Sequence, residues 1–369
     1  MKPNSFWENI FQNRSQSYLN NNTVFKTFRN FSSGENALSL PSNILGVFKN
    51  TKIEDLQTIP DIKCQKIKER ISQIFHITPE MIFVGNGSDE IIENIPRVFL
   101  EPHEFILTIA PTFFRFIEAS RKMKGNVLTV FTTPEEKFRF TKNVIDKALT
   151  VILEHQPKII WLCSPNNPTG AVMTSDQINR LVRASNNLVV IDEAFHEFID
   201  PENKKTAVSL LKEHKNLLVL KTFSKSWGVS GIRFGFAIGH PKIIKILEQW
   251  RLPFNINALS GKVVLTLLND INHLKFISEK TKENREKLFK EIKRLPDFEI
   301  GADSKTNIFI LKHRKKDLFQ ELIRKGILTA DLRNVVGLEG KKFVRITLHD
   351  RKKNLILLKA LRKIDNSSH

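Results

Sequence analysis

The chain has 369 residues, 41% of them hydrophobic, and a formal charge of +19, a composition typical of a globular protein with one large and one small domain. No apolar run approaches the roughly 18–20 residues that a transmembrane helix needs, so we expect no membrane partner. Basic and acidic residues alternate along the predicted helix faces, as in residues 280–293. We therefore expect a solvated surface and no nucleic-acid partner, with a basic rim that attracts anionic substrates as the alternative. Cys64 and Cys163 form neither a metal spacing nor a disulfide framework, which favours a reducing, cytoplasmic location.

In chain order, three regions differ in polarity and in the spacing of their apolar residues. Residues 1–40 are polar and irregular, and we expect an arm that packs on the smaller domain or on a partner subunit. In residues 41–255, short apolar strands alternate with amphipathic helices, which predicts a large α/β domain around a mostly parallel sheet. Residues 256–369 carry longer helices and short strands, which predicts a smaller α+β domain.

The predicted elements have these bounds. The seven strand candidates of the large domain are Met81–Val84, Phe105–Ile109, Val127–Phe131, Ile159–Cys163, Leu188–Asp192, Leu217–Lys221 and Phe234–Ile238. Helix candidates there include Asp89–Leu100 and Asp176–Ala184. The smaller domain is expected to hold helices at Ala258–Asn269, Ile277–Leu295 and from Lys352 onward, and strands at Thr306–Leu311 and Phe343–Ile346.

Polar segments follow several of these strands, at the edge where parallel sheets bind ligands. The first is Gly85–Glu90, in which two glycines turn the chain into a helix that opens at Ser88 and Asp89. Free N–H groups in a first helical turn make an anion site, although an ordinary turn with an N-cap residue explains the pattern equally well. The dinucleotide pattern fails because Glu90 stands at the third glycine position.

Three more segments carry candidate side chains. Phe113 follows a strand end, where it can stack on a planar heterocycle or simply pack in the core. The rigid turn Ser164–Gly170 can aim the Asn167 amide at a ligand. Asp192 ends a fully apolar strand, and such an acid is unfavourable unless it is paired. It is a helix N-cap, a metal ligand or the partner of a protonated ring nitrogen, and the lack of a nearby His/Asp cluster in the sequence argues against a metal.

The segment Thr222–Gly235 is the most informative. Lys225 lies just after an apolar strand, Thr222 and Ser224 precede it, and Arg233 follows in a glycine-punctuated stretch. A lysine so placed can form an imine with an aldehyde, while the hydroxyls and the arginine hold a phosphate beside it. Pyridoxal phosphate (PLP) is an aldehyde that carries a phosphate.

Taken together and in this order, the segments Gly85–Glu90, Ser164–Gly170 and Ser224–Lys225 resemble those of the fold-type-I PLP-dependent aminotransferases, and most closely the histidinol-phosphate aminotransferase group. The resemblance begins at Phe31 and ends at Thr347. It implies an α/β fold with a mostly parallel seven-stranded sheet in the large domain and a smaller α+β domain. It also implies PLP as cofactor and a homodimer.

The resemblance assigns roles to individual residues. Lys225 would hold PLP covalently and move the substrate's proton, and Asp192 would keep the ring nitrogen protonated. Asn167 would hydrogen-bond the ring oxygen, and Phe113 would stack on the ring. The phosphate would be held by Ser88, Asp89, Thr222, Ser224 and Arg233. The substrate would be bound by Arg345 and Asn36, and no metal is expected.

Four positions depart from the family pattern. Phe195 replaces a tyrosine whose hydroxyl would contact the ring oxygen, which predicts a raised pKa of the lysine–cofactor linkage. Ile59 replaces a tyrosine that would cross the dimer interface, and Ala37 replaces a proline. Ala330 stands at or next to an arginine that helps to bind the substrate phosphate, with Arg333 three residues further on.

Three functions remain open. The first is an aminotransferase of the histidinol-phosphate type, which passes an amino group between a phosphorylated amine or amino acid and a 2-oxo acid such as 2-oxoglutarate. The second is a decarboxylase of a phosphorylated amino acid that resembles threonine-phosphate decarboxylase. The third is a catalytically weak paralogue that binds PLP, which the intact Lys225, Asp192, Asn167 and Arg233 argue against.

Overall fold

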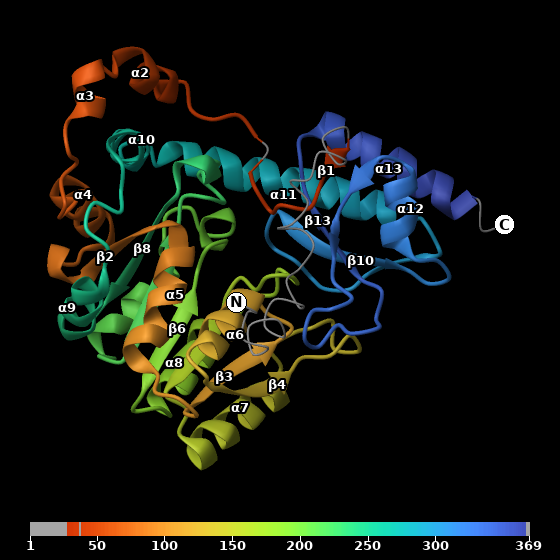
Figure 1. Ribbon diagram of the computed structural model, residues 1–369. Coiled ribbons are helices and arrows are strands. Elements are labelled where there is room, and N and C mark those ends of the chain that lie inside the picture. The colour runs from red at the N-terminus through yellow and green to blue at the C-terminus, as the bar shows by residue number, and fades with distance from the viewer. Residues whose placement is uncertain (1–27, 37, 367–369) are drawn as a thin grey trace, which may run out of the picture.

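The computed structural model describes residues 28–36 and 38–366. Most of the expected N-terminal arm, and the Ala37 departure, therefore lie outside the described residues. The described chain forms a large part around one sheet and a smaller part around another, and the long helix α11 (Asn272–Ile292) runs from the first toward the second (Figure 1).

The large part is built on a seven-stranded sheet in the order β2-β8-β7-β6-β5-β3-β4. Its strands are β2 (Ile82–Asn86), β3 (Phe105–Ala110), β4 (Asn126–Phe131), β5 (Ile159–Cys163), β6 (Leu188–Asp192), β7 (Leu217–Thr222) and β8 (Phe234–Gly239). Only β8 runs antiparallel to its neighbours, β2 and β7. The predicted mostly parallel seven-stranded sheet is thus confirmed.

Helices cover both faces of this sheet, which explains why its central strands are apolar along their whole length. One face packs against α5 (Gly87–Phe99), α6 (Phe114–Lys122) and α9 (Pro241–Trp250). The other packs against α4 (Gln65–Phe75), α7 (Lys142–His155), α8 (Ser175–Arg183) and α10 (Ala258–Leu268). Side chains of successive strand residues point to opposite faces, so each strand feeds both cores.

The smaller part has a four-stranded antiparallel sheet in the order β12-β13-β10-β9. Its strands are β9 (Phe298–Ile300), β10 (Ile308–His313), β12 (Ala330–Asp331) and β13 (Val344–Thr347). The helices α11, α12 (Leu318–Arg324) and α13 (Arg351–Asn366) pack on it. The short strand β1 (Arg29–Asn30) pairs in parallel with β11 (Ile327–Leu328), which joins the described start of the chain to this part.

The remaining elements are short. They are α2 (Asn43–Asn50), α3 (Ile53–Gln57) and the 3-10 turns η3 (Pro79–Met81), η4 (His196–Phe198), η5 (Ala207–Lys212) and η6 (Ser230–Ile232). The helices α2 and α3 lie at the edge of the molecule, joined to it by extended segments (Figure 1). Because α10 contributes to the core of the large sheet, that core continues beyond residue 255. The division into domains at residues 41–255 and 256–369 stays a prediction.

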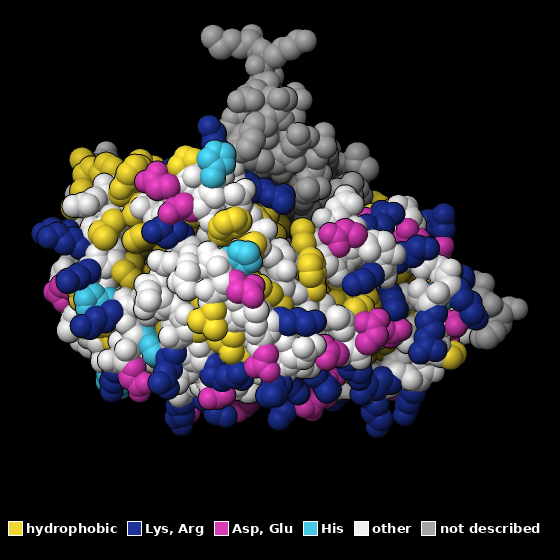
Figure 2. Space-filling view, turned by 90° about the horizontal axis from the view of Figure 1, so that it is seen from below, with side chains coloured by type: hydrophobic (Ala, Val, Ile, Leu, Met, Phe, Trp, Pro, Cys, Tyr) yellow, Lys and Arg dark blue, Asp and Glu magenta, His cyan; other side chains and the backbone are white. Residues whose placement is uncertain are grey.

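Charge is dispersed over the surface. On the face shown in Figure 2, acidic side chains lie among the lysines and arginines. Many of the cations are paired, for example Lys280 and Lys287 with Glu283. In the described part of the chain, no helix is both long and apolar enough to span a membrane.

Candidate active site

A cavity of about 440 Å³ lies at the carboxyl ends of the parallel strands. Sequence reasoning named ten of its lining residues for the site: Ser88, Asp89, Phe113, Asn167, Asp192, Thr222, Ser224, Lys225, Arg233 and Arg345. They come from segments far apart in the chain, and they meet because the strand ends β2, β3, β5, β6 and β7 share one edge of the sheet.

One end of the cavity is a cradle for an anion. Gly87 has a φ of +74°, and a Cβ there would lie 2.3 Å from Arg233 Nη2, so only glycine allows this approach. Arg233 Nη1 donates to Ser224 Oγ (3.3 Å), and its Nη2 donates to Asp89 Oδ2 (3.3 Å). The N-terminus of α5 begins at Gly87, so its first free N–H groups lie beside this guanidinium.

The hydroxyls of the cradle are held in place by one another. Thr222 Oγ1 donates to Ser224 Oγ (3.1 Å) and accepts from the Ser224 N–H (3.1 Å). A Cβ on Gly235 would lie 2.5 Å from Ser88 N, so this second glycine lets β8 approach the start of α5. Two hydroxyls, one guanidinium and a helix N-terminus thus converge, which is the donor set that a phosphate needs.

Asp192 and Lys225 both have perturbed acidity. Asp192 is 3% exposed, and burial raises its pKa to about 7. It accepts a hydrogen bond from the Ala194 N–H (2.8 Å). Burial, followed by the charge of Arg345, lowers the pKa of Lys225 to about 8. Lys225 therefore keeps a usable fraction of neutral amine near pH 7, as a nucleophile and base requires.

Arg345 and Asn167 are bonded to each other across the two parts of the protein. Arg345 Nη1 donates to Asn167 Oδ1 (2.7 Å), so the amide that was expected to face the cofactor ring also orients the arginine that was expected to face the substrate. Phe113, the other predicted ring contact, is held edge-on against Phe114 and Phe116, with ring centroids 5.3 and 5.5 Å apart.

Asn36 does not line the cavity with the other predicted residues. Its Nδ2 donates instead to the backbone oxygen of Ser226 (3.0 Å), directly after Lys225. Sequence reasoning also missed several lining residues: Asn30, Ser32, Ser33, Glu35, Cys163, Ala194, Ser230 and Leu328. Cys163 and Ala194 adjoin segments that were recognised. Asn30 to Glu35 are held at the cavity by the pairing of β1 with β11 and by bonds from this segment to Thr347 and Asn307.

The departures from the family pattern have distinct surroundings. Phe195 is 3% exposed and lines the cavity, with Lys225 Nζ 5.6 Å from its ring centre. Ala330 is 1% exposed and pairs with Arg345 between β12 and β13. Arg333 bonds Asp331 (Nε to Oδ2, 2.8 Å) and does not line the cavity, so it does not replace the expected arginine. Ile59 is 70% exposed and likewise lies outside the lining.

The residues present fit a phosphate-bearing aldehyde on a protonated heterocycle. The cradle around Arg233 suits the phosphate, and Lys225 suits the aldehyde. Among the described residues, no basic side chain forms an ion pair with Asp192 within 4.0 Å, although this buried acid is stable as an anion only beside a positive group. A protonated ring nitrogen would be such a group.

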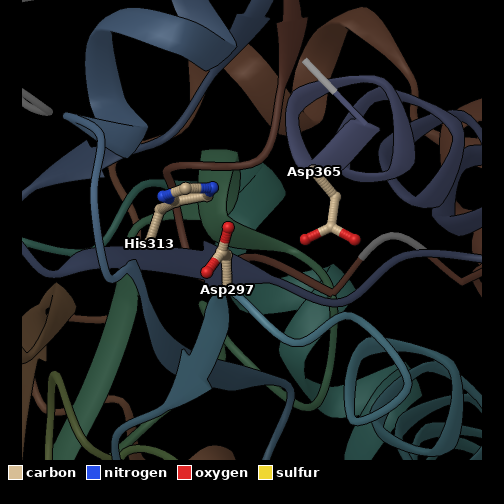
Figure 3. A group of neighbouring side chains, drawn as sticks. All are labelled: Asp297, His313 and Asp365. Atoms are coloured by element: carbon tan, nitrogen blue, oxygen red, sulfur yellow. The ribbon is translucent and has the colours of Figure 1, made fainter. Parts of the chain in front are cut away.

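A second buried group, Asp297, His313 and Asp365, has the composition of a metal site but not its hydrogen bonding (Figure 3). Their ligand atoms lie within 4.8 Å of one another. His313 Nδ1 accepts the backbone N–H groups of Lys315 (3.1 Å) and Lys316 (3.0 Å). The neutral ring therefore carries its proton on Nε2, which leaves that atom no lone pair for a cation. Lys315 Nζ, 3.0 Å from Asp297 Oδ2, supplies positive charge instead.

Comparison with known proteins agrees with this arrangement. The family described as aminotransferase class I and II matches residues 26–361. The chain belongs to this family. It is therefore a PLP-dependent aminotransferase with the fold-type-I architecture.

Individual relatives add detail. The chain is 34% identical to a histidinol-phosphate aminotransferase of Thermoanaerobacter pseudethanolicus, over 89% of this chain and 91% of the relative. A histidinol-phosphate aminotransferase of Sinorhizobium meliloti, solved in complex with pyridoxal-5'-phosphate, shares the fold with a TM-score of 0.82 at 18% identity, over 93% of this chain and 92% of that chain. The L-threonine-O-3-phosphate decarboxylase of Porphyromonas gingivalis does so with a TM-score of 0.78 at 22% identity, over 91% of this chain and 98% of that chain.

Proposed function

We propose that this aminotransferase is of the histidinol-phosphate type and passes an amino group between a phosphorylated amine or amino acid and a 2-oxo acid such as 2-oxoglutarate. The observation that supports this most is that one cavity holds Lys225, Asp192 and the Arg233 cradle together with Arg345. The first three suit the cofactor, and the fourth remains for an acidic substrate. The 34% identical relative of that name supports the substrate class.

When bound, PLP supplies an electron sink for breaking a bond at the substrate's amine-bearing carbon. Its phosphate would be held by the N–H groups of Ser88 and Asp89 and by the side chains of Thr222, Ser224 and Arg233. Arg233 suits this role because the planar guanidinium donates two parallel hydrogen bonds to phosphate oxygens. Phe113 and Asn167 would contact the ring.

Lys225 and Asp192 would handle the protons. Lys225 Nζ, whose pKa is lowered to about 8, would take a proton from the substrate carbon and return it to a neighbouring atom. Asp192 would hold a proton at the ring nitrogen. Its pKa of about 7 would fall once a positive partner lies beside it, so the pair would stay ionised at neutral pH.

Arg345 would bind the acidic group of each substrate. It is 8% exposed, and Asn167 accepts from its Nη1, which fixes the direction of the guanidinium. A pre-oriented arginine at the cavity wall favours an anionic substrate and holds it in one orientation.

A decarboxylase of a phosphorylated amino acid is the second candidate. Ala330 argues against the histidinol-phosphate assignment without identifying the alternative, because the described lining holds Arg233 and Arg345 as its arginines, one fewer than the family pattern provides for the substrate phosphate. The likeness in fold to a threonine-phosphate decarboxylase is consistent with this alternative.

One experiment separates the candidates. The protein is loaded with PLP and mixed with histidinol phosphate, glutamate or O-phosphothreonine, and absorbance and carbon dioxide are followed. Transamination predicts loss of the visible band, the amine form of the cofactor and no carbon dioxide. Decarboxylation predicts carbon dioxide without that form. Lys225→Ala should lack the visible band, and a band that survived this change would overturn the proposal.

We also propose that the enzyme works as a homodimer in a reducing cytosol. The segment of α2, α3 and the residues after them exposes large apolar side chains, including Ile53 (70%), Leu56 (63%) and Ile59 (70%). Such a group favours a protein partner. Both cysteines are buried and unpaired, which suits a reducing compartment. Light scattering of the wild type and of Leu56→Asp would test the dimer, which the charge should weaken.

A further inference from the structure

A buried ion cluster lies beneath the candidate active site. Lys221, in β7, is 1% exposed, and its Nζ contacts Glu193 Oε2 (2.9 Å), Glu197 Oε1 (3.1 Å) and Asn203 Oδ1 (2.9 Å). Glu193 and Glu197 are themselves 2% and 3% exposed. The cofactor chemistry derived above uses none of these side chains.

Two members of the cluster are chain neighbours of residues that line the cavity. Asp192 precedes Glu193, and Thr222 follows Lys221. Lys221 and Thr222 are neighbours within β7, so their side chains point to opposite faces of the sheet. Glu193 directly follows the last residue of β6. Asp192 and Thr222 line the cavity, whereas Glu193 and Lys221 do not.

The cluster also reaches the segment of the catalytic lysine. Ser226 follows Lys225, is fully buried, and its Oγ donates to Glu197 Oε2 (3.1 Å). Its backbone oxygen accepts from Asn36 Nδ2 (3.0 Å). The residue after Lys225 is thus held on two sides, by its hydroxyl and by its carbonyl.

The carboxylate oxygens of the cluster accept several hydrogen bonds besides those from Lys221. Glu193 accepts from Thr206 Oγ1 (2.5 Å) and from the Ala207 N–H (2.7 Å) in addition to Lys221. A buried ion cluster contributes little net stability compared with apolar side chains of the same volume. When every member is bonded, however, it fixes one arrangement of the chain segments that carry it.

We propose that Lys221, Glu193, Glu197 and Ser226 are positioning residues, which fix the Lys225 segment relative to Asp192 from the opposite face of the sheet. The inference rests on the proposed function, because it requires Lys225 to carry the cofactor. The bond from Ser226 to Glu197 is the link through which the cluster acts on Lys225, so its loss should move the lysine without removing any group that touches substrate.

The test compares Ser226→Ala with a matched control, Ser120→Ala. Ser120 is also fully buried, and its hydroxyl donates to the Phe116 oxygen (2.8 Å) and accepts from Trp161 Nε1 (3.3 Å), away from the cluster. For PLP-loaded Ser226→Ala, we expect kcat to fall about tenfold with KM changed less than about twofold, because a displaced catalytic group slows the reaction more than it weakens binding. For Ser120→Ala, both constants should stay at the wild-type values.

The visible band provides a readout besides activity. Lys225 is influenced by burial and by the charges of Arg345, Glu35, Asp89 and Asp192. If the Lys225 segment loosens, water enters and solvates the protonated nitrogen, which favours the charged form. The pH midpoint of the band should therefore rise in Ser226→Ala and not in Ser120→Ala.

The outcomes distinguish failure of the positioning role from failure of the proposed function. A wild-type protein without a visible band in the presence of PLP would remove the proposed function itself. A normal wild-type band, combined with a Ser226→Ala variant whose kcat and midpoint equal those of the control, would overturn the positioning role alone. Equal losses of thermal stability in the two serine variants, with a changed midpoint only in Ser226→Ala, would support it.

Discussion

Asp192→Asn tests most sharply what the acid at the end of β6 does. Burial raises the pKa of Asp192 from 3.8 to about 7, and the side chain is 3% exposed, so solvent screens it little. The difference between the two values corresponds to about 4 kcal/mol of folding free energy, at about 1.4 kcal/mol for each pH unit. We expect a protonated ring nitrogen of the bound cofactor to offset this cost.

The sign of the pH dependence follows from the proton balance. Between pH 3.8 and about pH 7 the folded protein keeps a proton on Asp192 that the unfolded chain has released. The folded state binds more protons, so the free energy of unfolding falls as the pH rises through this window. In Asp192→Asn this contribution is absent, and the cofactor-free variant should be more stable than the wild type above about pH 7.

Urea unfolding of the cofactor-free proteins at pH 5 and pH 8 measures the effect. Relative to Asp192→Asn, the wild type should lose about 3 kcal/mol between these two pH values. The control Asp176→Asn, at an exposed position, should show the same pH dependence of unfolding as the wild type. If the wild type and Asp192→Asn showed the same pH dependence of unfolding, Asp192 would not be a strained acid.

With PLP, the Asp192→Asn activity should fall about 10²–10³-fold, because a charge next to the reacting system is lost.

Three further changes test the cradle, the ring contact and the substrate contact. Gly87→Ala places a Cβ 2.3 Å from Arg233 Nη2 at a φ of +74°. PLP affinity, measured by equilibrium dialysis, should therefore fall, whereas unchanged affinity would contradict the phosphate cradle. Phe195→Tyr should lower the pH midpoint of the visible band, because the added hydroxyl would donate a hydrogen bond to the ring oxygen of the cofactor. A spectrophotometric titration identical to that of the wild type would count against this. Arg345→Gln should raise KM for the acidic substrate about 10–100-fold, since a hydrogen bond to a charged group contributes about 1.5–3 kcal/mol. An unchanged KM in steady-state kinetics would place the substrate's acidic group elsewhere.

The large sheet could be predicted because its strands are buried on both faces. The predicted bounds of Ile159–Cys163 and Leu188–Asp192 are those of β5 and β6, since fully buried parallel strands appear in the sequence as continuous apolar runs between turns. The predicted helix Asp176–Ala184 differs by one residue at each end from α8, which begins with a capping box of Thr174 and Gln177. Strands of two or three residues, such as β1 and β9, carry no periodicity and were missed.

The residues predicted for the cofactor could be grouped from the sequence because they follow strands of one parallel sheet, and they line one cavity in the structure. The other lining residues could not be predicted, because they reach the cavity through contacts between segments that are distant in the sequence. Asn30 reaches the cavity through the pairing of β1 with β11, Glu35 is held there by a bond from Asn307 to its backbone oxygen, and the bond from Arg345 to Asn167 joins the two parts of the molecule. A lysine inside an apolar strand, Lys221, was the one visible signal of the buried cluster.

We propose that Lys225 carries the cofactor, and borohydride reduction followed by peptide mass spectrometry tests this most directly. Reduction fixes a lysine-bound aldehyde, so the protein is incubated with PLP, reduced, digested and mapped. We predict one cofactor-sized mass increase, on the peptide that contains Lys225, and its loss in Lys225→Ala. An increase on a different lysine, or no increase in a preparation that is catalytically active, would contradict the account.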